Sequence, residues 1–234
     1  MRGSADVLVA GFPAVLGTNC WVVAPARGEQ CVVIDPGIDA VSPLEDLLAE
    51  HRLHPVAVIL THGHYDHTWS VVPVCGARGI PAYIHPRDRA QLTQPGGVAG
   101  RPPGTPLLGR LDFSEPDDVR ELVDGTAIEL GPVRLQVAYA PGHTPGSVTF
   151  AAAGDGDDAK QLFSGDLLFA GSVGRTDLPG GSLVHHPCVS DLRWIADAPE
   201  VPPGHRPARL TRLMSGMRSA RSGGCPGRAD RRQG

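Results

Sequence analysis

The segment THGHYDH, residues 61–67, places three histidines and an aspartate within seven positions. It directly follows the wholly apolar run at residues 56–60, which is typical of a buried strand. Imidazoles and a carboxylate crowded at the end of such a strand would repel one another or lose their hydrogen bonds to water. A divalent cation removes both problems. The segment therefore predicts a metal site at the edge of a sheet.

Within this segment, His62 and His64 are two residues apart, so in an extended chain their side chains face the same way and can bind one metal ion. Asp66 and His67 follow after a turn of the chain and are candidate ligands of a neighbouring second metal ion. Three further candidates lie elsewhere. They are His143 in APGHTPGS, Asp166 in FSGDLLF and His205 in VPPGHRPA.

Short apolar runs separated by Gly and Pro predict a strand-rich chain with interspersed helices. We expect strands at residues 7–10, 21–24, 31–35, 56–60, 82–85, 127–130, 133–139, 148–152 and 161–164. We expect helices after an N-cap at Ser42, near Asp66, at residues 86–92 and, weakly, at 189–196. Gly11 to Pro13 is expected to form a turn, and residues 94–118 a long loop or lid. This order favours a mixed α+β layered fold.

The composition limits the classes of protein to which the chain can belong. The chain has 234 residues, 41% hydrophobic and 20% charged, as in ordinary globular domains. Its formal net charge is −4, and its last 34 residues carry eight Arg and one Asp, so the first 200 residues sum to −11. This acidic body argues against a nucleic-acid partner. With no 18-residue apolar run, we expect no membrane partner and a cytoplasmic location. The five scattered cysteines are expected to be free thiols.

In combination, LTHGHYDH, APGHTPGS and FSGDLLFAGSVGRTDLPGG resemble the metallo-β-lactamase-fold hydrolases, specifically the short, single-domain members of the glyoxalase II (hydroxyacylglutathione hydrolase) branch. The segments GTNCWVV at 17–23 and VVIDPG at 32–37 are also similar to that branch. The resemblance covers about residues 6–182. It implies an α+β fold, a four-layer αββα sandwich with metal ions at one edge of two packed sheets.

The resemblance also implies roles for the candidate residues. His62, His64 and His143 would hold the first metal ion, Asp66, His67 and His205 the second, and Asp166 would bridge the two. Asp35 would orient the ligand loops from behind. Arg175 and Asp177 are expected to form a buried ion pair that shapes the floor of the site.

The implied reaction is the hydrolysis of a small-molecule hydroxyacyl thioester, similar to S-lactoylglutathione, by a hydroxide shared between two divalent metal ions. Zinc is expected first, with iron or manganese as alternatives, because sites built of His and Asp accept all three. Asp66 is also a candidate to orient the attacking nucleophile. The oligomeric state is left open.

Two departures from the family keep alternatives open. GRTDLPGG, residues 174–181, is also similar to persulfide dioxygenases, which use a single iron ion. After the domain at 1–182, residues 183–210 diverge while still carrying His205, and residues 211–234 form an Arg-rich tail. We hypothesise that this tail is either disordered or the product of a disrupted reading frame. A metal-binding but catalytically weak protein with a damaged C-terminus is therefore a further alternative.

Overall fold

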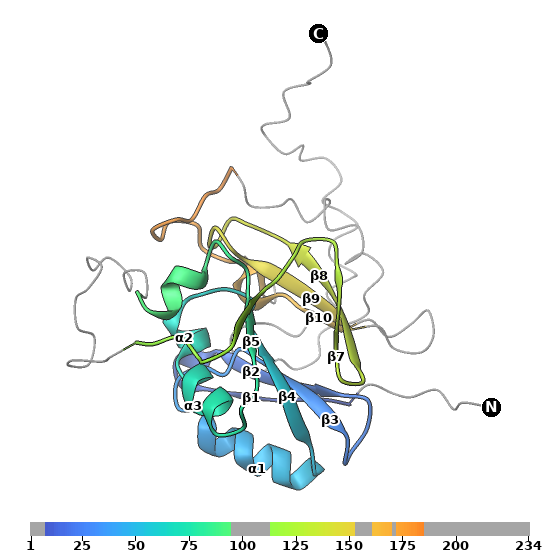
Figure 1. Ribbon diagram of the computed structural model, residues 1–234. Helices are drawn as coiled ribbons and strands as arrows, with labels where there is room; N and C mark the ends of the chain where they lie inside the picture. The colour runs from blue at the N-terminus through green and yellow to red at the C-terminus, as the bar shows by residue number, and fades with distance from the viewer. Residues whose placement is uncertain (1–7, 95–112, 153–160, 170–171, 185–234) are drawn as a thin grey trace.

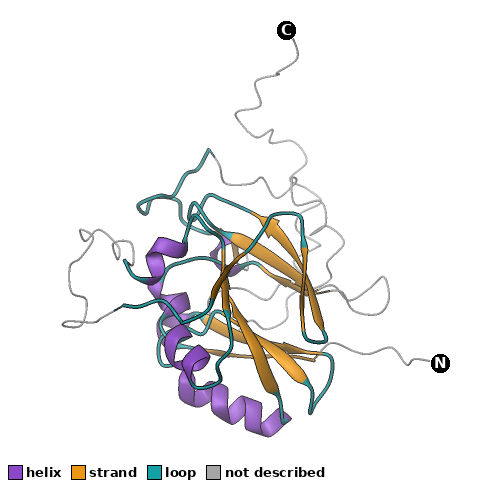
Figure 2. Cartoon of the chain, in the orientation of Figure 1, coloured by secondary structure: helices purple, strands orange, loops and turns teal. Residues whose placement is uncertain are grey.

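The computed structural model describes residues 8–94, 113–152, 161–169 and 172–184. These residues form two β-sheets packed face to face, with helices against the outer face of the larger sheet (Figures 1 and 2). The larger sheet has the order β1-β2-β3-β4-β5-β6 and the smaller the order β10-β9-β8-β7. None of the helices in the described segments is long and apolar enough to cross a membrane.

The strands of the larger sheet are β1 (Leu8–Pro13), β2 (Asn19–Ala24), β3 (Gln30–Ile34), β4 (His54–Ile59), β5 (Ala82–Ile84) and β6 (Val119–Glu121). Those of the smaller sheet are β7 (Ala127–Leu130), β8 (Val133–Tyr139), β9 (Val148–Ala152) and β10 (Gln161–Phe163). β11 (Leu168–Phe169) pairs with β12 (Ser172–Val173). The helices are α1 (Val41–His51), α2 (Tyr65–Thr68) and α3 (Val71–Gly76), with 3-10 turns η1 (Val15–Gly17), η2 (Arg89–Leu92) and η3 (Gly165–Leu167).

After their polar and exposed first residues, Gln30 and His54, the central strands β3 and β4 are apolar, because both of their faces are covered. In β3, Val33 packs toward the helices with Leu44 of α1, whereas its neighbours Val32 and Ile34 pack toward the smaller sheet with Phe150 of β9. Two separate apolar layers result, one beneath the helices and one between the sheets. The expected α+β sandwich is confirmed.

Strand direction brings four strand ends to one edge of this sandwich. β3 and β4 are parallel, and β8 and β10 both run antiparallel to β9 and therefore parallel to each other. The sheets are joined at this edge by a main-chain hydrogen bond of 2.8 Å, which the N–H of Val148 donates to the carbonyl of Thr61. The segments that follow β3, β4, β8 and β10 carry Asp35, residues 61–67, His143 and Asp166 respectively, with residues 65–67 in α2 and Asp166 in η3.

Several predicted boundaries differ from the structure. Residues 11–13 are not a turn, since β1 continues through Pro13 opposite Asn19. Gly11 is needed there for close packing, because a Cβ at this position would lie 2.3 Å from the Trp21 ring. α1 begins at Val41 after Ala40, so Ser42 is not its N-cap. The short strand β6 was not expected. The predicted helix at 189–196 and residues 95–112 of the predicted loop lie outside the described residues.

Candidate metal centre

Three imidazoles converge at the shared edge of the two sheets. Nε2 of His62 lies 3.2 Å from Nδ1 of His64, and Nε2 of His143 lies 2.9 Å from the same atom. His62 and His143 are almost fully buried, and His64 is partly exposed. The structure therefore brings together the three residues that the family resemblance assigns to one ligand set.

The spacing of these nitrogens fits a single metal ion. Ligands about 2.0–2.1 Å from a tetrahedral zinc ion lie about 3.3 Å from one another, close to the two distances between these rings. Without a cation, Nδ1 of His64 faces two nitrogens at once, although an N–H points at only one acceptor. A metal ion would accept the lone pairs of all three rings.

A second group lies beside the first and consists of His62, His67 and Asp166. The two oxygens of Asp166 face different histidines: Oδ1 lies 3.2 Å from Nε2 of His67, and Oδ2 lies 3.5 Å from Nε2 of His143. Asp66 is adjacent, with Oδ2 3.8 Å from Nε2 of His67. His205 lies outside the described residues.

Hydrogen bonds behind the rings set which nitrogen faces the centre. Asp35 is buried and accepts three of them, from the main-chain N–H of Thr61 at 2.8 Å, from the Thr61 hydroxyl at 2.6 Å and from Nδ1 of His67 at 3.0 Å. Because the Thr61 hydroxyl proton is directed at Asp35, its oxygen accepts from Nδ1 of His62 at 3.0 Å. Both rings then turn Nε2, the nitrogen that would bind a metal ion, toward the centre.

His143 is held in the same way by the main chain, because its Nδ1 donates to the carbonyl of Arg175 at 2.8 Å. The side chain of Arg175 forms the expected ion pair with Asp177 at 2.7 Å. The prediction that this pair is buried is wrong, since the two side chains are 53% and 67% exposed. The pair therefore lies in solvent, and Arg175 contacts the site through its main-chain oxygen.

Burial keeps the first three imidazoles neutral, which is the form that binds metal. Burial, and then the neighbouring His143 ring, lower the pKa of His64 to about 4. Burial also lowers the pKa of His62 and of His143. Burial alone would lower the pKa of His67 too, but the carboxylates of Asp166, Asp66 and Asp35 raise it well above its ordinary value. The three carboxylates around His67 thus provide the concentrated negative charge that a cation would balance.

Two residues that the sequence did not single out support these ligands. The fully buried Thr18 donates its hydroxyl to Oδ2 of Asp66 at 3.0 Å. Thr61 links Asp35 to His62, because its hydroxyl donates to Asp35 and accepts from Nδ1 of His62. Thr61 lies inside the histidine-rich segment and could have been noticed there. Thr18 is 48 residues from Asp66, and nothing in its local sequence signals the contact.

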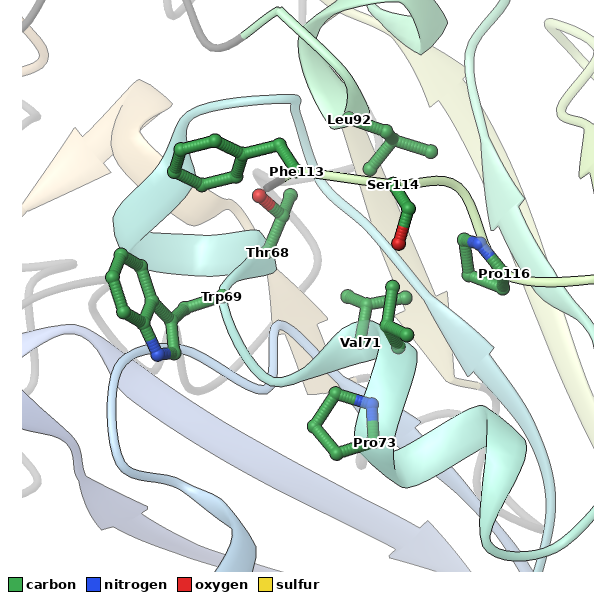
Figure 3. A pocket seen from close by; sticks show the side chains of 9 residues that line it. Thr68, Trp69, Val71, Pro73, Leu92, Phe113, Ser114 and Pro116 are labelled. Carbon is green, nitrogen blue, oxygen red and sulfur yellow. The ribbon is translucent and has the colours of Figure 1, made fainter. Parts of the chain in front are cut away.

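A cavity of about 320 Å³ borders the helix that carries Asp66 and His67 (Figure 3). Its lining residues are Thr68, Trp69, Val71, Val72, Pro73, Leu92, Phe113, Ser114 and Pro116. Trp69 and Phe113 meet edge to face, with ring centroids 5.9 Å apart. This volume is within the usual range of small-molecule pockets, but the lining includes none of the candidate ligands.

Residues 13–206 match the sequence model of the metallo-beta-lactamase superfamily. An uncharacterised protein of Mycobacterium leprae is 44% identical over 203 residues, which cover 85% of this chain and 91% of that protein. A Bacillus subtilis protein named "Probable metallo-hydrolase YqgX" is 33% identical, covering 66% of this chain and 68% of its own. The similarity to glyoxalase II is more distant. The hydroxyacylglutathione hydrolase of Pectobacterium carotovorum is 28% identical, covering 70% of this chain and 52% of that protein.

Solved structures give the same family. The B3 metallo-beta-lactamase BLEG-1 is 33% identical, with a TM-score of 0.70, over 90% of this chain and 97% of that one. TTHA1623, solved in a di-iron-bound form, is 33% identical, with a TM-score of 0.60, and the match covers 92% of this chain and 94% of that one. ETHE1 from Myxococcus xanthus shares the fold. It is 23% identical, with a TM-score of 0.61, and the match covers 88% of this chain and 80% of that one.

Proposed function

This chain belongs to the metallo-beta-lactamase superfamily, and from that premise we propose that it is a binuclear metal-dependent hydrolase that cleaves the thioester of a hydroxyacyl thiol similar to S-lactoylglutathione. The observation that carries the proposal is the convergence of the His62, His64 and His143 nitrogens beside a second group of His67 and Asp166. A bound divalent ion would supply a Lewis acid and would lower the pKa of a bound water toward neutrality.

We assign His62, His64 and His143 to the first metal ion, Asp66, His67 and His205 to the second, and Asp166 to both. The bridging role is supported by the carboxylate of Asp166, whose two oxygens face His67 and His143 respectively. The role of His205 is supported by the family match, which extends to residue 206. We propose zinc as the metal, with iron or manganese as alternatives, since His and Asp donors suit all three.

Asp66 is proposed to orient the attacking water as well as to bind the metal. Its carboxylate is held in one direction by the hydroxyl of Thr18, itself fully buried. A thioester suits such a site because a thiol has a pKa of about 8.5 and leaves as a thiolate. The chain then needs to orient water and ligands but need not protonate the leaving group.

Hydrolysis of a β-lactam is a second candidate. The 33% identity and TM-score of 0.70 with the B3 metallo-beta-lactamase BLEG-1 favour it. This reaction also begins with attack on a carbonyl, but it expels an amide nitrogen, which must gain a proton before it leaves. The two reactions therefore make different demands on the same metal centre.

A substrate panel on one preparation tests the proposal. S-lactoylglutathione, a chromogenic cephalosporin and glutathione persulfide are supplied separately, and thioester absorbance, cephalosporin colour and oxygen uptake are recorded. We expect thioester cleavage that a chelator abolishes and added zinc restores. Cephalosporin turnover alone would favour the second candidate, and oxygen uptake alone would identify a dioxygenase and contradict both.

A further inference from the structure

Asp88 is a fully buried carboxylate outside the proposed ligand set. It directly precedes η2, and both of its oxygens accept hydrogen bonds from other segments. Oδ2 accepts from the main-chain N–H of Gly63 at 2.9 Å and from the hydroxyl of Thr144 at 2.6 Å. Oδ1 accepts from the main-chain N–H of Gly146 at 2.7 Å.

These three donors lie in the two loops that carry the first ligand set. Gly63 stands between His62 and His64, and Thr144 directly follows His143. One carboxylate therefore ties together, through side-chain hydrogen bonds, the segments that supply all three imidazoles. The donors are 25 to 58 residues from Asp88 along the chain, so the connection exists only in the folded protein.

The hydrogen bonds around Thr144 have defined directions. Its hydroxyl donates to Asp88, so the 2.7 Å contact with the Ser147 hydroxyl must be donated by Ser147. The oxygen of Ser147 in turn accepts the main-chain N–H of Thr144 at 3.1 Å. The residue after His143 is thus fixed at both its main chain and its side chain.

The two loops also pack directly against Asp88. A Cβ at Gly146 would lie 2.6 Å from Cγ of Asp88, and one at Gly63 would lie 2.8 Å from the Asp88 carbonyl oxygen. Glycine at both positions allows this close approach. Burying a carboxylate is costly, and an apolar side chain would often stabilise a core at least as well. What the carboxylate adds is directional bonding to both loops.

We propose that Asp88 is a positioning residue for the first metal ion, holding the loop of His62 and His64 against the loop of His143. This inference rests on the proposed function only in requiring that the protein binds metal. Residues that orient metal ligands typically contribute about 10- to 100-fold in metal affinity.

The test compares Asp88→Asn, Thr144→Val and Thr144→Ser with the full-length wild-type protein. Asparagine turns an NH₂ group toward at least one of the donors, and valine removes the Thr144 hydroxyl while keeping the shape of the side chain. Serine keeps the hydroxyl. Asp118→Asn is the matched control, since Asp118 is 48% exposed and pairs with Arg120. Zinc affinity is measured by competition with a chromogenic chelator, and the visible spectrum is recorded with cobalt.

We expect Asp88→Asn and Thr144→Val to weaken zinc binding about 10- to 100-fold and to alter the cobalt spectrum, while Thr144→Ser and Asp118→Asn leave both near wild type. If Asp88→Asn fails to fold, the comparison of Thr144→Val with Thr144→Ser tests the inference. The inference would be overturned if Thr144→Val, and Asp88→Asn where it folds, kept the zinc affinity and cobalt spectrum of the wild type and lost only thermal stability. Wild-type protein that binds zinc without cleaving thioesters refutes only the proposed substrate, whereas wild-type protein that binds no zinc refutes both proposals.

Discussion

Oδ2 of Asp35 lies 3.0 Å from Nδ1 of His67, and both side chains are buried. The same oxygen accepts the hydroxyl of Thr61, which in turn faces Nδ1 of His62. One aspartate therefore sets the orientation of a histidine in each of the two ligand groups, directly in one case and through a hydroxyl in the other.

Asp35→Asn is expected to weaken metal binding about 10- to 100-fold, because the amide cannot accept hydrogen bonds at both of its terminal atoms. Metal affinity by chelator competition measures the effect. Asp39→Asn is the control, since this exposed residue is four positions away and, like Asp35, has a positive φ that asparagine tolerates. Equal affinities for the two variants would show that Asp35 does not orient the ligands.

His143→Ala is expected to remove one metal ion per chain and to lower thioester hydrolysis more than about 100-fold, since one of the three histidine ligands of the first site is lost. Elemental analysis and initial rates on the same sample measure both. His54→Ala changes an exposed histidine at the start of β4 and should leave metal content and rate unchanged. Full metal content in His143→Ala would rule out the assigned ligand set.

Gly174→Ala is expected to destabilise the fold by about 1–3 kcal/mol and to weaken metal binding, because a Cβ there would lie 1.6 Å from the carbonyl oxygen of Asp166. Urea unfolding measures the stability. Gly76→Ala is the matched control, since nothing lies within 4 Å of its added Cβ. Equal free energies of unfolding for the two variants would mean that the main chain at Asp166 can move away from the added Cβ without loss of stability.

The thiols of Cys31 and Cys75 should not react with iodoacetamide in the native protein at mildly alkaline pH. Burial raises the pKa of each to about 12. Peptide mapping by mass spectrometry should find both modified only after denaturation. Between the unfolded pKa near 9 and the folded value, the unfolded state releases thiol protons that the native state keeps, so stability should fall as pH rises. Native labelling of either thiol would contradict its burial.

Much of the fold could be predicted from the sequence. Apolar runs bounded by Gly and Pro indicate strands, and alternation of apolar and polar residues, as in β8, indicates a strand with one buried and one exposed face. The structure has β7, β8 and β9 with the predicted bounds. β6 escaped prediction because it has three residues, two of them charged, and is recognised only through its pairing with β5.

The site divides in the same way. Ligand side chains could be found because His and Asp gather beside strand ends in short motifs. Of the residues that support them, Asp35 was expected only from the family resemblance, and Thr61 and Asp88 were not expected. Their contacts join distant segments, since Asp35 and Thr61 are 26 residues apart and Asp88 and Thr144 are 56 apart. Such contacts depend on how the sheets pack. The ion pair of Arg175 and Asp177 was predicted from its local sequence, but its exposure depends on the surrounding fold.

The most direct test of a binuclear hydrolase is the number of metal ions bound per chain, by elemental analysis of protein purified without added metal, with S-lactoylglutathione hydrolysis assayed on the same sample. The account predicts two metal ions per chain together with hydrolysis, and the loss of one of them in His205→Ala. A single iron ion per chain without hydrolysis would contradict it.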